Sequence, residues 1–543
     1  MTVRPSHFSG LARRRSFTSK LRRQDFSAAT LRATAMVILV ATFVRLGLAA
    51  LLDPGLDEVY AMAVAKRWQL SWFDHPPMAF WWVKATREIA KPLFGDDVPV
   101  LVLRLPFVFA FTITSVVVFD LTCRRWGPRA GLWTLLALSL APFFMVSAGS
   151  WLVPDGPLVM FLSLTAWLLD RILFSKRTPA SEGRLWLAAG LTLGLAGLSK
   201  YHAVLFAVGA AVFILATHHR RRLMTPAPWL AVAITGLVVS PVFVWNLQHD
   251  WVGFLFQSSR GVGSGGPDWS GLARSALGQM AYLGPWTLVA ALAATISMYR
   301  SKGSRAGPAA FLAAFGLPSI FVFTAMPLWG GDALPHWQMP GWLFLLPILG
   351  HAIASLEARR HQSHRLARGI AAIAAAILGI AIMIVTVMRY TPPSSAFIAR
   401  LGLDPFLEES FTWRGLADNL AQRGLLAPVT TPQDRPLVVA FSWVEASRLA
   451  EALGSRATVL VFGDDPRGFA FLAGSPAWIG RDVLLIGRPG SFARGLKSAR
   501  PHFTRIDRKA PVAVEIGNEI LFEAEVAIGR NLVSPYPLPY PRP

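Results

Sequence analysis

Residues 56–82 read LDEVYAMAVAKRWQLSWFDHPPMAFWW, and they follow the first long apolar segment of the chain. Two acidic residues, Asp57 and Glu58, stand at its beginning, while Asp74 and His75 come directly before two prolines. We expect an aromatic helix over residues 58–70, suited to the headgroup region of a membrane. The proline pair then breaks the helix and holds His75 in an extended pose, since a residue before proline avoids helical geometry. The stretch predicts an interfacial loop that carries acids and a base.

The composition is that of a polytopic membrane protein. Of its 543 residues 53% are hydrophobic and only 15% are charged, and the mean hydropathy is +0.45. Such a chain has too much apolar surface for a water-soluble domain. The net charge of +22 lies mostly in short loops, and with no nucleic-acid motif beside it we expect no nucleic-acid partner. Cys123 is the only cysteine, which excludes an internal disulfide and makes redox chemistry a poor interpretation.

The hydropathy pattern predicts eleven transmembrane helices. The connections that would face the cytoplasm hold 24 of the 53 lysines and arginines, which places the N-terminus in the cytoplasm. Residues 185–217 are too long for one span, because a single helix of that length would measure about 50 Å against a core of about 30 Å. We expect two short helices that meet at Lys200. The predicted helices cover residues 31–51, 99–120, 130–148, 153–170, 185–199, 201–217, 228–246, 275–297, 309–327, 338–356 and 367–389.

Three regions follow from this topology. Residues 1–30 form a basic cytoplasmic segment, and residues 31–390 form the transmembrane domain, with a first outer loop at 53–98. An odd number of spans puts residues 391–543 outside the cytoplasm. The stretches RPLVVAFS at 435–442, EASRLAEALG at 445–454, ATVLVFGDD at 457–465 and DVLLIG at 482–487 are typical of strand, helix, strand and strand in that order. They predict a small soluble α/β domain, which ends in an extended Pro-rich tail.

The polar residues that stand out gather on the outer side of the membrane. We expect one carboxylate of the Asp57–Glu58 pair to accept the proton of an attacking hydroxyl; the alternative for Asp57 is an N-cap of the helix that follows. The scarcity of ionisable groups at the midplane disfavours a proton-coupled transporter. The other candidates are substrate-binding residues in or beside outer loops: Asp74, His75, Lys200, Tyr201, His249, Asp250 and His336.

Two of these positions have a direct chemical rationale. Lys200 lies in a tight outer turn between apolar helices, where an ammonium group needs an anionic partner such as a phosphate. His75 stands beside Asp74, where a lipid phosphate would need a cation. Asp155 opens a predicted span, and its alternative is again an N-cap. The histidines at 249 and 336 could equally serve as structural hydrogen-bonding groups.

Several motifs in order resemble the bacterial membrane glycosyltransferases of the GT-C fold, related to protein O-mannosyltransferases and lipid A aminoarabinose transferase. They cover roughly residues 35–350 and include DEVY, WFDHPPM, RLP, RRWGPRAGLW, PDGPL, LSKYHA, WNLQHDW and PHWQMPGW. The resemblance implies Asp57 as the base and Asp155 as a second catalytic acid, which in some members binds a divalent metal. It implies no other cofactor. The aminoarabinose transferase has lysine where this chain has His75, so the resemblance does not identify the donor sugar.

The reaction implied by this resemblance is the inverting transfer of a sugar from a polyprenyl-phosphate donor at the outer face of the cytoplasmic membrane. The resemblance leaves four classes of acceptor: lipid A, another glycolipid, a polysaccharide and a protein. Membrane lipids are the surrounding partners. The competing interpretations are a lipid or solute transporter without covalent chemistry and a non-catalytic membrane scaffold whose outer domain binds a partner.

Overall fold

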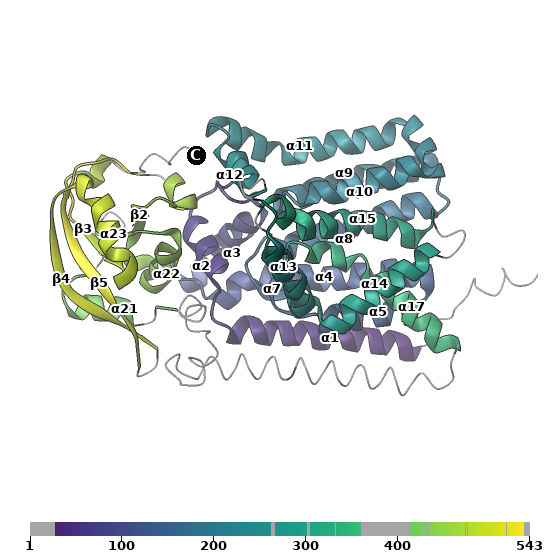
Figure 1. The fold of residues 1–543 in the computed structure, drawn as a ribbon, viewed down its shortest axis with the longest axis horizontal. Helices are drawn as coiled ribbons and strands as arrows, with labels where there is room; N and C mark the ends of the chain where they lie inside the picture. Colours follow the sequence, from purple (N-terminus) through teal and green to yellow (C-terminus); the bar gives the residue numbers. More distant parts are fainter. Residues whose placement is uncertain are drawn as a thin grey trace, which may run out of the picture.

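A computed structural model describes residues 28–261, 266–300, 305–331, 333–359, 379 and 412–536, the last range with short gaps at 414, 428, 430, 432–433, 473, 475 and 517–518. Figure 1 shows long helices lying side by side, with a β-sheet beyond one of their ends and α2 and α3 between the two. Most of the predicted basic segment 1–30, nearly all of the predicted span 367–389 and the last residues of the Pro-rich tail lie outside the described residues.

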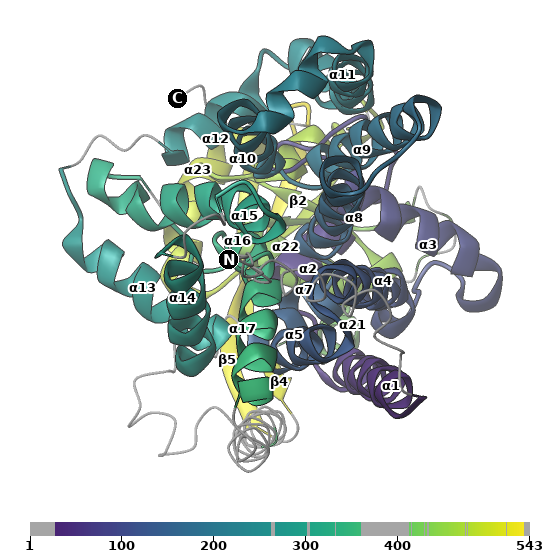
Figure 2. The same cartoon turned by 90° about the vertical axis from the view of Figure 1, so that its right-hand side faces the viewer.

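The helices of the larger part form a bundle, seen along its axis in Figure 2. Their apolar side chains make a continuous core around α8, α15 and α16. The elements are α1 (Ala28–Leu51), α2 (Leu56–Val64), α3 (Met78–Phe94), α4 (Val100–Trp126), α5 (Pro128–Leu140), α6 (Pro142–Met145), α7 (Ser147–Ser150), α8 (Asp155–Phe174), α9 (Pro179–Ser199), α10 (Ala203–Ala216), η1 (His218–Met224), α11 (Pro226–Gln248), α12 (Val252–Gly261), α13 (Trp269–Leu283), α14 (Pro285–Arg300), α15 (Pro308–Ala325), η2 (Met326–Trp329), α16 (Met339–Leu343) and α17 (Leu346–Arg359).

Within the described residues, six helical segments are long and apolar enough to cross a membrane, and nine if each of three bent pairs is counted as one span. The prediction of eleven spans is therefore confirmed only as a polytopic helical fold. The two helices predicted around Lys200 are present as α9 and α10. The first-loop helix is shorter than expected, because α2 ends at Val64 rather than near residue 70.

Two segments predicted as single spans are bent in the structure. The segment 130–148 turns by 85° between α5 and α6–α7, and the segment 275–297 turns by 99° between α13 and α14. Pro142 and Pro285 begin the second helix of each pair, a position where the missing N–H of proline costs no hydrogen bond. Gly284, with φ +87°, supplies a backbone conformation that other residues rarely adopt. These bends leave room for a cavity at one end of the bundle.

The C-terminal residues form a five-stranded sheet in the order β2-β1-β3-β5-β4. The first three strands are parallel, and β5 pairs antiparallel with β3 and β4. Alternate residues of β1 face a core with α22 on one side and a core with α23 on the other. The elements are α21 (Leu416–Gln422), β1 (Leu437–Ala440), α22 (Trp443–Leu453), η4 (Gly454–Arg456), β2 (Thr458–Val461), η5 (Arg467–Phe471), η6 (Pro476–Trp478), β3 (Val483–Gly487), α23 (Pro489–Ala499), η7 (Arg500–His502), β4 (Phe503–Ile516) and β5 (Glu519–Leu532).

The sheet and the first loop share one hydrophobic core. Side chains of α2 and α3, including Tyr60 and Phe80, belong to the same buried cluster as Val438 of β1 and Leu449 of α22, and α2 packs directly against α22. Burial of such apolar surface is the main favourable term in folding. The C-terminal elements therefore pack onto α2 and help to fix the position of this helix. The division of the chain into separate transmembrane and soluble domains stays a prediction.

Candidate active site

A cavity of about 540 Å³ lies between the end of the helix bundle and the C-terminal elements. Side chains from α2, the loop before α3, the start of α8, the turn after α9, α12 and η5 line it. Three of the ten predicted site residues, namely Glu58, His249 and Asp250, are absent from its walls. The other seven line the cavity: Asp57, Asp74, His75, Asp155, Lys200, Tyr201 and His336.

Asp57 lies in the first turn of α2, where its carboxylate lines the cavity. The N-cap of α2 is Gly55, so the alternative interpretation of Asp57 as an N-cap is wrong. Asp57 is exposed to the cavity, but protein surrounds its carboxyl group on the other sides, and this burial raises its pKa; Asp74 adds to the shift, and the cations Arg467 and Lys200 oppose it. A raised pKa makes the ionised carboxylate a stronger proton acceptor.

Hydrogen bonds tie the loop before α3 to two distant elements. The Tyr60 hydroxyl donates to Asp74 Oδ1 at 2.9 Å, and it accepts from the backbone N–H of Gly468 at 2.9 Å. Gln257 Nε2 of α12 donates to the Asp74 carbonyl at 2.5 Å. Burial raises the pKa of Asp74. Asp74 therefore acts first by fixing the loop that presents its neighbour His75.

The two histidines in the cavity wall are uncharged at neutral pH. Burial, followed by the positive charge of Lys200, lowers the pKa of both His75 and His336 to about 3. A neutral imidazole offers one hydrogen-bond donor. In the predicted contact between His75 and a phosphate, the neutral ring would therefore donate a hydrogen bond to a phosphate oxygen, and the positive charge must come from other residues.

Lys200 and Asp155 form a buried ion pair in the cavity wall. Lys200 Nζ lies 3.0 Å from Asp155 Oδ1 and 3.1 Å from Oδ2, and each side chain is 5% exposed. Pro154 is the N-cap of α8 and Asp155 its first residue, so the N-cap alternative for Asp155 is also wrong. An ammonium group has three donors. Two of them go to Asp155, which leaves one for a ligand in the cavity.

Two arginines in the wall were missed by the sequence analysis as site residues. Arg260 lies in the last turn of α12, with its guanidinium 4.9 Å from the Trp337 ring centroid. Arg467 begins η5, with its guanidinium 3.9 Å from the ring centroid of Trp443, which also lines the cavity. The Arg467 backbone has φ +44°. No spacing rule links these positions to residues 56–82, because folding alone brings them together.

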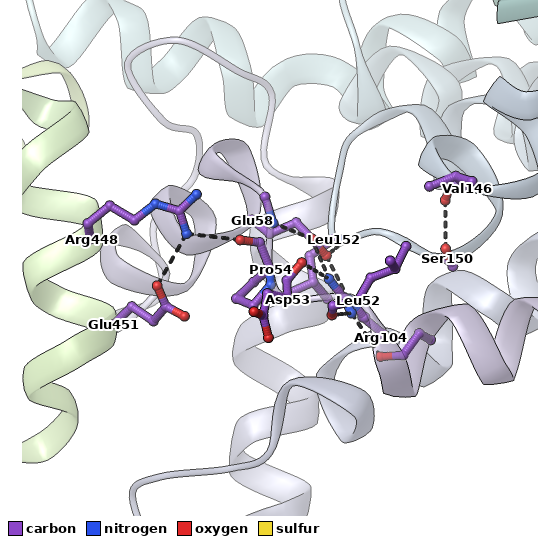
Figure 3. Close-up of polar contacts among 12 residues, drawn as sticks. Leu52, Asp53, Pro54, Glu58, Arg104, Val146, Ser150, Leu152, Arg448 and Glu451 are labelled. Atoms are coloured by element: carbon purple, nitrogen blue, oxygen red, sulfur yellow. Dashed lines mark hydrogen bonds and ion pairs between the residues drawn. The ribbon is translucent and has the colours of Figure 1, made fainter. Parts of the chain in front are cut away.

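Glu58 is a structural residue. Its carboxylate accepts from Arg104 Nε at 2.8 Å and Arg104 Nη2 at 2.6 Å, and both side chains are fully buried. It also accepts from the backbone N–H of Leu152 and of Gly55, each at 2.9 Å. Figure 3 shows this network beside Arg448, which donates to the Pro54 carbonyl. With its oxygens engaged in this way, Glu58 is not available as a catalytic base, and that prediction is corrected.

His249 and Asp250 lie outside the cavity. The His249 ring stacks on Trp245 with centroids 4.2 Å apart, and its Nδ1 lies 2.8 Å from the Trp245 carbonyl. Asp250 and Trp251 both have positive φ, at 53° and 61°. This segment makes the tight turn between α11 and α12. Its role in the structure is to bring α12, with Gln257, against the first loop.

The donor set at Asp155 does not fit a metal centre. No group of three histidine, cysteine, aspartate or glutamate side chains that could hold a metal comes together among the described residues. Both Asp155 oxygens already accept from Lys200, whose positive charge disfavours a cation at the same carboxylate. The predicted metal role of Asp155 therefore gains no support from its geometry.

Comparisons with known proteins agree with this architecture. Residues 74–245 match the family described as dolichyl-phosphate-mannose-protein mannosyltransferase. Lipid A galacturonosyltransferase RgtD from Rhizobium johnstonii is 28% identical over 195 residues, which are 36% of this chain and 39% of that protein. The match thus spans well under half of the curated relative.

The similarity to ArnT from Cupriavidus metallidurans extends over nearly the whole chain. The apo crystal structure matches with a TM-score of 0.61 and 16% identity, over 92% of this chain and 98% of ArnT. The structure bound to undecaprenyl phosphate gives a TM-score of 0.61 and 17% identity over the same shares. These matches confirm the predicted resemblance: residues 74–245 match the model of the mannosyltransferase family, and the chain has the GT-C fold of ArnT.

Proposed function

We propose that this protein is an inverting membrane glycosyltransferase that moves a sugar from a polyprenyl-phosphate donor to an acceptor hydroxyl at the outer face of the cytoplasmic membrane. The observation that carries the proposal is a single cavity with a carboxylate of raised pKa, Asp57, and three cations, Lys200, Arg260 and Arg467. The ArnT structure with undecaprenyl phosphate supports a polyprenyl donor for this fold. RgtD supports a glycolipid as one class of acceptor.

The chemistry requires one displacement. The acceptor oxygen forms a bond to the anomeric carbon of the donor sugar, and the bond from that carbon to the phosphate oxygen breaks. Its electron pair leaves with the polyprenyl phosphate, and the acceptor proton passes to Asp57. One displacement inverts the anomeric centre.

The cations act on the leaving phosphate. Lys200, which keeps one donor free of Asp155, and the two arginines are suited to stabilise the negative charge that grows on the phosphate. His75 and His336 add neutral hydrogen-bond donors. The apolar helices of the bundle supply the surface that a polyprenyl chain needs.

The test begins with a deletion strain whose envelope lipids and glycans are compared with wild type by mass spectrometry. The missing sugar identifies donor and acceptor. Asp57→Asn should then insert and fold normally but reduce transfer by roughly 10²–10⁴-fold, the usual contribution of a general base. Asp418→Asn, at an aspartate whose side chain is 70% exposed on α21, is the matched control and should transfer at the wild-type rate.

Two results would contradict the proposal. Normal transfer by Asp57→Asn would remove Asp57 as the base. Movement of a substrate across proteoliposomes by the wild-type protein, with no change in envelope glycosylation in the deletion strain, would favour the transporter.

A further inference from the structure

A second cavity lies at the C-terminal end of α2. It measures about 390 Å³ and is bounded by residues at the end of α2, by β2 and by η6. Four cations line it: Lys66, Arg67, Arg435 and Arg481. Among the described residues of its wall none is acidic. We call it the basic cavity.

Two of these cations, Arg435 and Arg481, lie just before β1 and β3 and are held by polar contacts. Arg481 Nη2 donates to the Arg435 carbonyl at 2.8 Å. Arg435 Nη2 lies 3.1 Å from Asp96 Oδ2, but Asp96 also pairs with Lys91 at 2.9 Å, so one carboxylate serves two cations. The Nε of Arg435 is buried and has no hydrogen-bond partner. A buried donor of this kind is costly unless a ligand satisfies it.

The positive charge is not offset by the end of α2. A helix C-terminus carries a partial negative charge on its last carbonyls, but Arg87 covers them, with Nη2 3.2 Å from the Met62 carbonyl and Nη1 3.5 Å from the Ala65 carbonyl. Lys66 reaches solvent, but the protein that surrounds its ammonium group, followed by the charges of Arg87 and Arg435, lowers its pKa to about 8, while Asp97 and Asp96 oppose the shift. Cations crowded in this way favour a bound anion.

The remaining wall suits an anion attached to a sugar. Phe469, Leu472 and Trp478 give it an apolar and aromatic side, and its volume lies in the range of small-ligand pockets. Tyr60 and Ala61 of α2 line the first cavity, whereas Ala63 of the same helix lines the basic cavity. Asp57 stands in the first turn of α2, and Lys66 follows two residues after its last residue, Val64; the helix rises by about 10 Å between Asp57 and Val64. That separation allows one extended acceptor to reach both cavities.

We propose that the basic cavity binds an anionic group, a phosphate or a carboxylate, of the acceptor, and so selects acidic acceptors. This inference rests on the proposed glycosyl transfer. The anionic group remains unchanged in the reaction, and its contacts place the attacking hydroxyl beside Asp57.

Hydrogen–deuterium exchange of the full chain in phosphatidylcholine nanodiscs tests the binding. Inorganic phosphate, compared with chloride at equal ionic strength, should slow exchange in residues 457–461 and 476–482. In the double variant Lys66→Gln, Arg481→Gln this effect should be lost, and in Arg67→Gln phosphate should bind roughly tenfold more weakly, the usual effect of one charged hydrogen bond. Arg508→Gln, an exposed arginine on β4 at the opposite edge of the sheet, should behave as wild type.

Three outcomes distinguish a failure of this inference from a failure of the proposed function. Phosphate-dependent protection only around the first cavity, abolished by Lys200→Gln, would place the phosphate at the donor site. That result would overturn the inference about the basic cavity and leave the proposed transfer intact. Protection in nanodiscs with phosphatidylglycerol but without phosphate would assign the basic cavity to a lipid headgroup and overturn its assignment to the acceptor. Active Asp57→Asn would overturn the proposed function independently of phosphate binding.

Kinetics with acceptor lipid from the deletion strain complete the test. The double variant should raise KM for the acceptor roughly tenfold or more and leave KM for the donor unchanged. An unchanged KM for the acceptor would overturn the inference even if inorganic phosphate binds.

Discussion

Asp57 and Glu58 are neighbours in the sequence, but their side chains meet different surroundings. Asp57 lines the first cavity, whereas Glu58 lies in a fully buried network with Arg104 and the backbone of Gly55 and Leu152. Sequence reasoning identified the acidic pair because both positions follow an apolar segment. It could not divide the roles, since Arg104 lies 46 positions after Glu58 and nothing in their spacing predicts the ion pair.

Glu58→Gln should destabilise the protein strongly. Removing one partner of a buried ion pair leaves the other charge uncompensated and costs about 3–5 kcal/mol of the free energy of unfolding. Thermal unfolding of the purified protein in detergent should therefore begin at a lower temperature than for wild type. Asp57→Asn is the matched comparison and should unfold close to wild type. Equal unfolding temperatures for wild type and Glu58→Gln would contradict a structural role.

Arg467→Gln should move the acidic limb of the pH–rate profile to higher pH. Asp57 must be ionised to accept a proton, so activity falls as the pH drops through its pKa. Burial raises that pKa and Arg467 lowers it; without the guanidinium the pKa rises further. The dependence of kcat/KM on pH measures the shift, and Arg467→Lys should retain the wild-type limb. A shift to lower pH would show that another group controls this limb.

At the scale of elements, the ion pair of Asp155 and Lys200 joins the first residue of α8 to the turn between α9 and α10. The sequence predicted both residues for the site, because the alternation of spans places these two helix ends on one side. It predicted neither their contact nor the bends at Pro142 and Pro285, since mean hydropathy measures composition along a segment and is insensitive to its direction.

The double variant Asp155→Asn, Lys200→Gln separates the stability of this pair from its function. Each single variant leaves one buried charge alone and should lower the unfolding temperature. The double variant should recover much of that loss, because both charges are gone, yet KM for the donor should stay raised if Lys200 binds its phosphate. Thermal unfolding and donor kinetics of all four proteins form a complete cycle. A double variant with the wild-type KM for the donor would remove Lys200 from the donor site.

At the scale of the whole molecule, the site is assembled from both ends of the described chain. Seven predicted residues line one cavity because several connections of the helix bundle converge at one of its ends. Arg467 and Trp443 come from the C-terminal elements, about 400 positions after Asp57, and only the packing of α22 against α2 brings them in. Family motifs over residues 35–350 gave no sign of this contribution.

The proposed orientation can be measured by labelling in intact cells. Arg508→Cys, on exposed β4, should react with a membrane-impermeant maleimide, whereas Arg220→Cys, on η1 at the opposite end of the bundle, should react only after permeabilisation. The native Cys123 is buried and should give little background. Labelling of position 220 but not position 508 in intact cells would place the cavity on the cytoplasmic side.

The hydrogen bond from the Gly468 N–H to the Tyr60 hydroxyl has a consequence for biogenesis. A ribosome completes α1 and α2 long before it reaches residue 468, so the nascent chain holds Asp57 while the cavity still lacks Arg467 and Trp443. Chains that stop early should accumulate as inserted but inert polypeptides. On the proposed function, the protein gains activity only after its last quarter has been synthesised and packed onto α2.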